Sequence, residues 1–396
     1  MTKKHVMTIV LLVMVLPLGC SRREHQVSQP VMTAERLERA NSLGLDPKTP
    51  RGLTRLVQVE SMTAMRESLE RSLVPGQPWH VLALSGGGQW GAFGAGFMKG
   101  WTQRTTEPKR PEFRVVTGTS TGSLIATFAF LGSGFDDALR DAYLGIRGDD
   151  DVFENRWLVG LVFGDALSST KPLRRRLNGF ITPEVLAKVA EEGRRGRRLF
   201  VGSVDLDHGT FKPWDLTEIA SRGGEQARQQ YIDALMASTA IPVAFPPVVI
   251  GDTTYVDGGV RRNIFLEIVV SEAQRFRTLE ASAPSQATVY CLVNGTLDVG
   301  TRVVRRRVLD IARRSVDILL DESTDGNLLR IYLLAKRAGL GFQVAHIPAL
   351  ACASIGSEEH QFDPTLMKCL YDEGQRTARD EAEPWLAEPV LGSLKP

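Results

Sequence analysis

The chain has 396 residues, of which 43% are hydrophobic and 24% charged. These proportions are typical of a folded protein with a sizeable core, and they exclude bulk disorder. The formal net charge of +2 is close to balance, so it gives no support for a nucleic-acid-binding protein. We expect one large folded domain, with or without small attachments.

The first 19 residues are typical of a signal peptide. Lys3 and Lys4 precede the apolar run Val6–Leu18, which is shorter than the roughly 20 residues of a membrane-spanning helix. Cys20 follows within Leu18-Gly19-Cys20-Ser21, which resembles a bacterial lipoprotein box. We therefore expect an exported protein that lipid on Cys20 anchors in the bacterial cell envelope. The alternative is a plain secretory peptide, in which case Cys20 is incidental.

Residues 20–78 are expected to form a tether and an N-terminal helix outside the main domain. The polar, proline-containing segment Ser21–Gly52 predicts a tether, with a short helix at Ala34–Asn41 capped by Thr33. Apolar residues at helical spacing predict a longer helix at Leu53–Leu73 that packs against the main body.

The remaining cysteines allow at most one disulfide. Cys291 lies in an apolar run and is expected to be buried, whereas Cys352 and Cys369 are a possible pair. None of the cysteines has the spacing of metal ligands, so we expect neither a metal nor a cofactor.

Strand-like and helix-like segments alternate over residues 79–396, the expected main domain. This alternation predicts an α/β fold, a three-layer sandwich around a mostly parallel central sheet. The expected strands are His80–Leu84, Phe113–Thr117, Leu199–Val204, Thr253–Val256, Ala287–Val293 and Phe342–Ile347. The expected helices are Ala92–Gln103, Glu225–Thr239, Val303–Leu320 and Asn327–Arg337.

The stretch Val115–Leu131 predicts a strand, a sharp turn and a helix, which is the layout of a nucleophile elbow. Ser120 occupies the tip of the turn, and Gly118 and Gly122 flank it because the turn is too tight for side chains. Amides at the start of the helix favour negative charge beside the serine. By itself the GxSxG pattern is weak, so the case depends on its context.

A second glycine-rich loop supplies that context. Gly86, Gly87 and Gly88 follow the first strand and offer backbone amides for an oxyanion hole, to which the Thr121 amide adds another. Because parallel strands end at the same edge of a sheet, we expect this loop to lie beside Ser120.

The general base has two kinds of candidate. Asp257, followed by Gly258 and Gly259, is placed to act directly on the serine as a dyad partner. Alternatively, His346 or His360 completes a triad in the order serine, aspartate, histidine.

Four motifs in this order resemble the patatin-like phospholipase family: GGGxxG ending at Gly91, GTSTG around Ser120, the block Ala237–Pro247, and DGG beginning at Asp257. With the lipoprotein box, the chain resembles a bacterial envelope branch of that family. The resemblance implies a lipid acyl hydrolase with Ser120 as nucleophile, Asp257 as general base and Gly86 to Gly88 as oxyanion loop. Its substrate is then a membrane phospholipid or another acyl-ester lipid. Trp90 departs from the family pattern, since many members have Arg or Lys there.

Other functions remain open at this stage. The glycine loop also spells GxGxxG, the pattern of dinucleotide-binding proteins, although no acidic residue ends the following strand. A catalytically silent envelope lipoprotein with a hydrolase fold is a further alternative.

Two other kinds of segment are candidates for contact with a membrane or its lipids. The basic clusters Arg174–Arg176, Arg194–Arg198 and Arg305–Arg307 either meet anionic lipid head groups or form solvated faces. The apolar run Trp157–Phe163 is either a lid or acyl-chain pocket, or a buried element of the core.

Overall fold

The structure is a computed structural model that describes residues 32–72, 78–155, 168–279, 287–297, 303–304, 306–349, 351–352, 354–355 and 361–389. The predicted signal peptide, Cys20 and the run Trp157–Phe163 lie outside the described residues. Within the described parts, no helix is both long and apolar enough to cross a bilayer.

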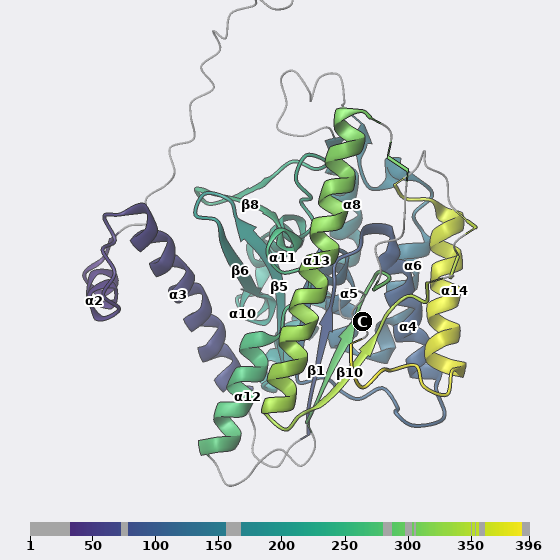
Figure 1. Ribbon diagram of the computed structural model, residues 1–396, viewed down its shortest axis with the longest axis horizontal. Coiled ribbons are helices and arrows are strands. Elements are labelled where there is room, and N and C mark those ends of the chain that lie inside the picture. Colours follow the sequence, from purple (N-terminus) through teal and green to yellow (C-terminus); the bar gives the residue numbers. More distant parts are fainter. Residues whose placement is uncertain are drawn as a thin grey trace, which may run out of the picture.

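An eight-stranded sheet forms the middle layer (Figure 1). Five strands run parallel because buried apolar runs alternate with helices, which return each strand in the same direction. In spatial order they are β10 (Gly341–Ala345), β9 (Ala287–Leu292), β1 (Trp79–Leu84), β2 (Val115–Thr119) and β5 (Arg198–Asp205). This confirms the α/β fold with a mostly parallel central sheet.

Helices cover both faces of the sheet (Figure 1). One core packs α3 (Pro50–Glu70), α12 (Glu267–Leu279) and α13 (Val308–Arg337) against the sheet. The opposite core includes α4 (Gly91–Gln103), α5 (Thr121–Leu131), α6 (Asp136–Leu144), α9 (Pro183–Arg194), α11 (Gly224–Ser238) and α14 (Pro364–Asp380). The smaller elements are α2 (Ala34–Ser42), α8 (Lys171–Phe180), α10 (Leu216–Ser221), β3 (Glu154–Asn155) and β4 (Ser168–Ser169).

The sheet ends in antiparallel strands that position the site. β6 (Thr210–Asp215) covers one edge of β5, and two partners share the other edge. Residues 198–202 of β5 pair with β2, and residues 203–205 pair with β8 (Thr253–Asp257), which continues to β7 (Val248–Ile250). Since β8 runs antiparallel to β5, the carboxyl ends of β2 and β8 meet end to end.

Several predicted elements are found with changed limits. The strand expected at Phe113–Thr117 begins and ends two residues later, because Thr119 still pairs with Gly202 of β5. The helices expected at Val303–Leu320 and Asn327–Arg337 form one helix, α13, since a single glycine, Gly326, does not break a helix. Thr33 caps α2 as predicted, with its side chain accepting the Arg36 amide.

The burial and pairing of the cysteines agree with the sequence analysis. Cys291 is fully buried in β9. A disulfide joins Cys352 to Cys369, the possible pair of the sequence analysis, and ties the loop before α14 to that helix.

Candidate active site

Ser120 lies at a strained turn between β2 and α5. Its φ of +52° and ψ of −127° fall in a region that residues other than glycine rarely adopt. A Cβ at position 118 would lie 2.4 Å from the Gly122 carbonyl oxygen, and one at position 122 would lie 2.4 Å from the Leu84 carbonyl oxygen. Both flanking glycines are therefore required by close backbone contacts, as a nucleophile elbow demands.

Asp257 lies beside Ser120 because β2 and β8 meet along one edge of β5. Gly202 pairs with Thr119, the residue before the serine, and the next residue of β5, Ser203, pairs with Asp257. The Asp257 side chain is buried, and its Oδ1 accepts the Gly259 N–H at 2.7 Å. Apart from the Ser120 hydroxyl, whose effect on the carboxyl is described below, its Oδ2 has no hydrogen-bond partner in the described part of the chain.

The environment of Asp257 suits a general base. Burial raises the pKa of the carboxyl from 3.8 to about 7, against the lowering effect of hydrogen bonds from the Gly259 amide and the Ser120 hydroxyl. A carboxyl with a pKa near neutrality can take up and return a proton under working conditions.

The same raised pKa predicts an effect on stability. Between pH 3.8 and about 7 the folded protein keeps a proton that the unfolded chain releases, so the free energy of unfolding falls as pH rises. We expect Asp257→Asn, which cannot ionise, to be more stable than the wild type at alkaline pH and to lose this advantage in acid. Urea denaturation at both pH values measures the difference. A variant less stable at alkaline pH would contradict the raised pKa.

The glycine loop faces the site, with one change from the prediction. The Gly86 amide donates to the Asn263 carbonyl at 3.0 Å, so it is not free for a substrate oxygen. Gly88 opens a short 3-10 helix (Gly88–Trp90) and Thr121 opens α5, and the first amides of a helix lack partners within it. Gly88, Ser120 and Thr121 all line the same pocket, and the neighbouring Gly87 N–H donates to no backbone carbonyl of the described residues. The amides of Gly87, Gly88 and Thr121 therefore remain as candidate donors.

Two asparagines that the sequence analysis missed hold the glycine loop. Asn294 donates its Nδ2 hydrogen to the Ser85 carbonyl at 2.7 Å, and its backbone N–H donates to Ser85 Oγ at 2.8 Å. Its carbonyl oxygen would be 1.9 Å from a Cβ at Gly87. Asn263 holds Gly86 as described above. Asn294 comes shortly after the end of β9, which is the one sequence signal that could have identified it, whereas Asn263 follows the 3-10 helix Gly258–Val260 and carries no such signal.

The block Ala237–Pro247 connects the two candidate catalytic residues. Ser238 Oγ accepts the Ser120 N–H at 3.1 Å and donates to the Gly202 carbonyl at 2.7 Å. Two residues later, the Ala240 carbonyl accepts the Asp257 N–H at 2.9 Å. One short segment therefore fixes the backbone of both Ser120 and Asp257.

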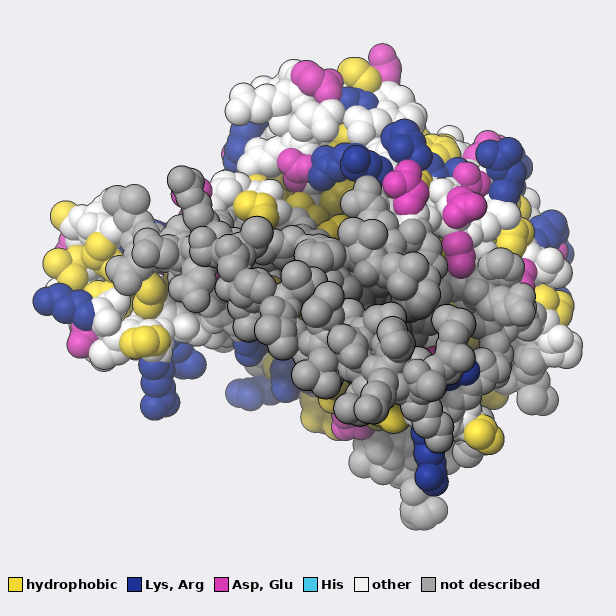
Figure 2. Space-filling model, turned by 90° about the horizontal axis from the view of Figure 1, so that it is seen from above, with side chains coloured by type: hydrophobic (Ala, Val, Ile, Leu, Met, Phe, Trp, Pro, Cys, Tyr) yellow, Lys and Arg dark blue, Asp and Glu magenta, His cyan; other side chains and the backbone are white. Residues whose placement is uncertain are grey.

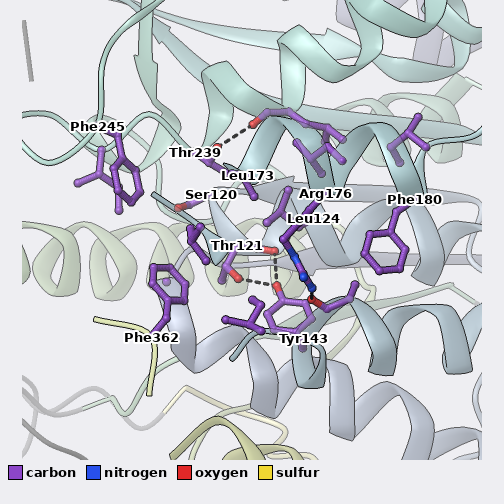
Figure 3. A pocket seen from close by; sticks show the side chains of 18 of the residues that line it. Ser120, Thr121, Leu124, Tyr143, Leu173, Arg176, Phe180, Thr239, Phe245 and Phe362 are labelled. Atoms are coloured by element: carbon purple, nitrogen blue, oxygen red, sulfur yellow. Dashed lines mark hydrogen bonds between the residues drawn. The ribbon is translucent and has the colours of Figure 1, made fainter. Parts of the chain in front are cut away.

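Tyr143 supports the first residue of α5. Its hydroxyl lies 2.5 Å from Thr121 Oγ1 and donates to the Thr121 carbonyl at 3.1 Å (Figure 3). Burial raises the pKa of Tyr143, so the hydroxyl stays protonated as a donor. This contact fixes the residue whose amide is a candidate oxyanion donor.

An apolar pocket opens at Ser120 (Figure 3). It has a volume of about 800 Å³, its open mouth included, and aliphatic and aromatic side chains form most of its wall. Figure 3 places Phe245 and Phe362 on one side of Ser120 and Phe180 on the other. The site thus joins a candidate nucleophile to a cavity suited to hydrocarbon.

The comparison with protein families agrees with this geometry. Residues 82–270 match the family model described as patatin-like phospholipase. The chain contains a patatin-like phospholipase domain. The matched segment contains Ser120, Asp257 and the glycine loop. The family match favours a hydrolase over the dinucleotide-binding alternative. The matched segment lies within the expected main domain.

Comparisons with individual proteins add nothing to the patatin-like assignment. Among solved structures, the crystal structure of VipD from Legionella pneumophila is similar, with 11% sequence identity and a TM-score of 0.35. The match covers 76% of this chain and 67% of that one. No curated protein matches the chain.

Histidine does not take part in the described site of the patatin-like domain. His346 lies at the end of β10, where its Nδ1 is 3.0 Å from the Ile347 carbonyl oxygen. It does not line the pocket, and the groups that shift the pKa of Asp257 include no histidine from the described residues. His360 lies outside the described residues.

The arginines of the basic clusters are divided between the interior and the surface of the protein. Arg197 and Arg198 are buried and donate to backbone carbonyls, so they cannot meet lipid head groups as the sequence analysis allowed. Arg174 pairs with Asp233 at 2.7 Å and Arg195 with Glu191 at 2.7 Å. On the described part of the face seen in Figure 2, basic and acidic side chains are interspersed. Arg305 lies outside the described residues.

Proposed function

We propose that the protein is a lipid acyl hydrolase that cleaves carboxylic ester bonds through an acyl-enzyme on Ser120, with Asp257 as the general base. The observation that carries the proposal is the buried Asp257 carboxyl, with a pKa raised to about 7 beside the Ser120 hydroxyl. The patatin-like domain supports lipid acyl hydrolase activity in general.

In the proposed mechanism, Asp257 takes the Ser120 proton as Oγ attacks the ester carbonyl. The amides of Gly87, Gly88 and Thr121 then stabilise the negative oxygen of the tetrahedral intermediate, helped by the N-terminus of α5. Asp257 returns the proton to the leaving alcohol. The same carboxylate then deprotonates a water molecule, which attacks the acyl-enzyme; as the bond to Ser120 Oγ breaks and the fatty acid leaves, Asp257 returns that proton to Oγ.

The cellular setting belongs to the same proposal. Lipid on Cys20 would hold the enzyme at a membrane surface of the bacterial envelope, where its substrates are. Mass spectrometry of the mature N-terminus tests this part, and a chain that begins beyond Cys20 would contradict it.

Trp90 affects the expected substrate range. Trp90 is exposed at the end of the short 3-10 helix Gly88–Trp90, at the position where many members of the family have Arg or Lys. Since backbone amides alone then serve the oxyanion, we expect neutral esters to be cleaved as well as phospholipids.

Fatty acid release from a panel of phospholipids and neutral esters tests the proposed activity. We expect release from both classes and covalent labelling of Ser120 by a fluorophosphonate. A folded protein that releases nothing and is not labelled would instead be the silent lipoprotein with a hydrolase fold.

A further inference from the structure

We infer that one arm of the pocket holds a single acyl chain of medium length, about eight to ten carbons, and that Phe180 sets the limit. The inference rests on the proposed function, because it concerns the acyl group that Ser120 would carry.

Two helices form the walls of this arm and give its length. From Ser120 the pocket follows α5 past Thr121 and Leu124 to Phe128, and it follows α8 from Leu173 to Phe180. Thr121 to Phe128 and Leu173 to Phe180 both span seven residues, which is about 10 Å at a rise of ~1.5 Å per residue. In the view of Figure 3, Phe180 lies on the far side of Leu124 and Arg176 from Ser120.

Aromatic rings close the far end. Phe128 and Phe180 contact each other edge to face, with centroids 6.4 Å apart and an interplanar angle of 85°. Leu131, one turn beyond Phe128 on α5, no longer lines the pocket. Phe180 is only partly buried, so its ring separates the end of the arm from the protein surface.

The arm is suited to hydrocarbon and not to a polar head group. Among the described residues that line it, the charged one is Arg176, which donates to the carbonyls of Ala142 at 2.9 Å and Gly145 at 3.2 Å. The guanidinium is therefore held at the end of α6, and its carbon stem faces the pocket. The head group of a lipid must remain on the side of Ser120 that Phe245 and Phe362 line.

The length of the arm limits the number of acyl-chain carbons that it can hold. An extended chain of three bonds advances about 3.5 Å, or ~1.2 Å per bond. About 10 Å then accepts eight to nine bonds beyond the reacting carbonyl. Each methylene that enters should raise kcat/KM by up to about fourfold until the arm is full.

The experiment measures kcat/KM for the p-nitrophenyl esters of butyrate, octanoate, decanoate, dodecanoate and palmitate. We expect the wild type to prefer octanoate or decanoate. Phe180→Ala opens the far end and should raise the ratio of palmitate to decanoate about tenfold. Leu124→Trp fills the arm one turn from Ser120 and should reverse the ratio of decanoate to butyrate.

Phe135→Ala is the matched control. Phe135 is also half-buried and packs on Phe128 with centroids 6.5 Å apart, but it does not line the pocket. This variant should keep the wild-type chain-length profile. Palmitate as the best wild-type substrate, or an unchanged profile in both Phe180→Ala and Leu124→Trp, would overturn the inference. If the wild type hydrolysed none of these esters, that result would instead contradict the proposed function.

Discussion

Asp257→Asn should lower kcat for ester hydrolysis by about 10⁴-fold, and Ser120→Ala should lower it at least as much. Asparagine keeps the shape of the side chain and can still accept the Gly259 N–H, but it cannot take a proton from the serine. The Asp257→Asn variant should therefore fold normally but lose ester hydrolysis. Steady-state hydrolysis of a soluble ester measures the effect, with circular dichroism as the check on folding.

The histidine variants are the controls for this result. His346→Ala and His360→Ala should each leave kcat within about twofold of the wild type, since a serine–aspartate dyad needs no histidine. A histidine change as damaging as Ser120→Ala would replace the dyad by a triad.

Gly87→Ala should lower kcat by about 10² to 10³-fold, the usual effect of losing one oxyanion donor. The new Cβ would lie 1.9 Å from the Asn294 carbonyl oxygen, which is backbone and cannot yield like a flexible side chain. The loop must move, and its amides move away from the position of the developing negative oxygen. The loss should fall on kcat more than on KM, because the oxyanion forms only in the transition state.

Gly132→Ala separates this effect from general backbone strain. Gly132 also has positive φ, at +94°, but a Cβ there meets nothing within 4 Å and lies at the far end of α5. This variant should lose some stability and keep its kcat. If Gly87→Ala kept wild-type kcat, the glycine loop would not supply the oxyanion donors.

The sequence predicted those parts of the site that depend on local geometry. A turn as tight as that at Ser120 needs glycine on both sides, so the elbow is visible in the residues themselves. The glycine loop is recognisable for the same reason, because it follows a buried apolar strand. Both motifs stand at the ends of strands that alternate with helices, which is enough to predict the parallel sheet.

The parts of the site that depend on pairing between distant strands could not be predicted from local sequence patterns. The position of Asp257 follows from an antiparallel strand that meets β2 end to end, and no local pattern encodes that register. Asn294, Asn263 and Ser238 act through hydrogen bonds to residues distant in the sequence, and polar residues of these types are common in loops. The apolar pocket combines side chains from several helices, each of which alone resembles an ordinary core face.

The central claim is that the Asp257 carboxylate activates Ser120. The most direct test is the rate at which a fluorophosphonate labels Ser120, measured from about pH 5 to about pH 9 in the wild type and in Asp257→Asn. Because only the ionised carboxylate can act as base, the wild-type rate should rise with pH and reach half its maximum near the Asp257 pKa of about 7. The variant should be slow throughout, without this rise. Labelling of Asp257→Asn at the wild-type rate would contradict the account.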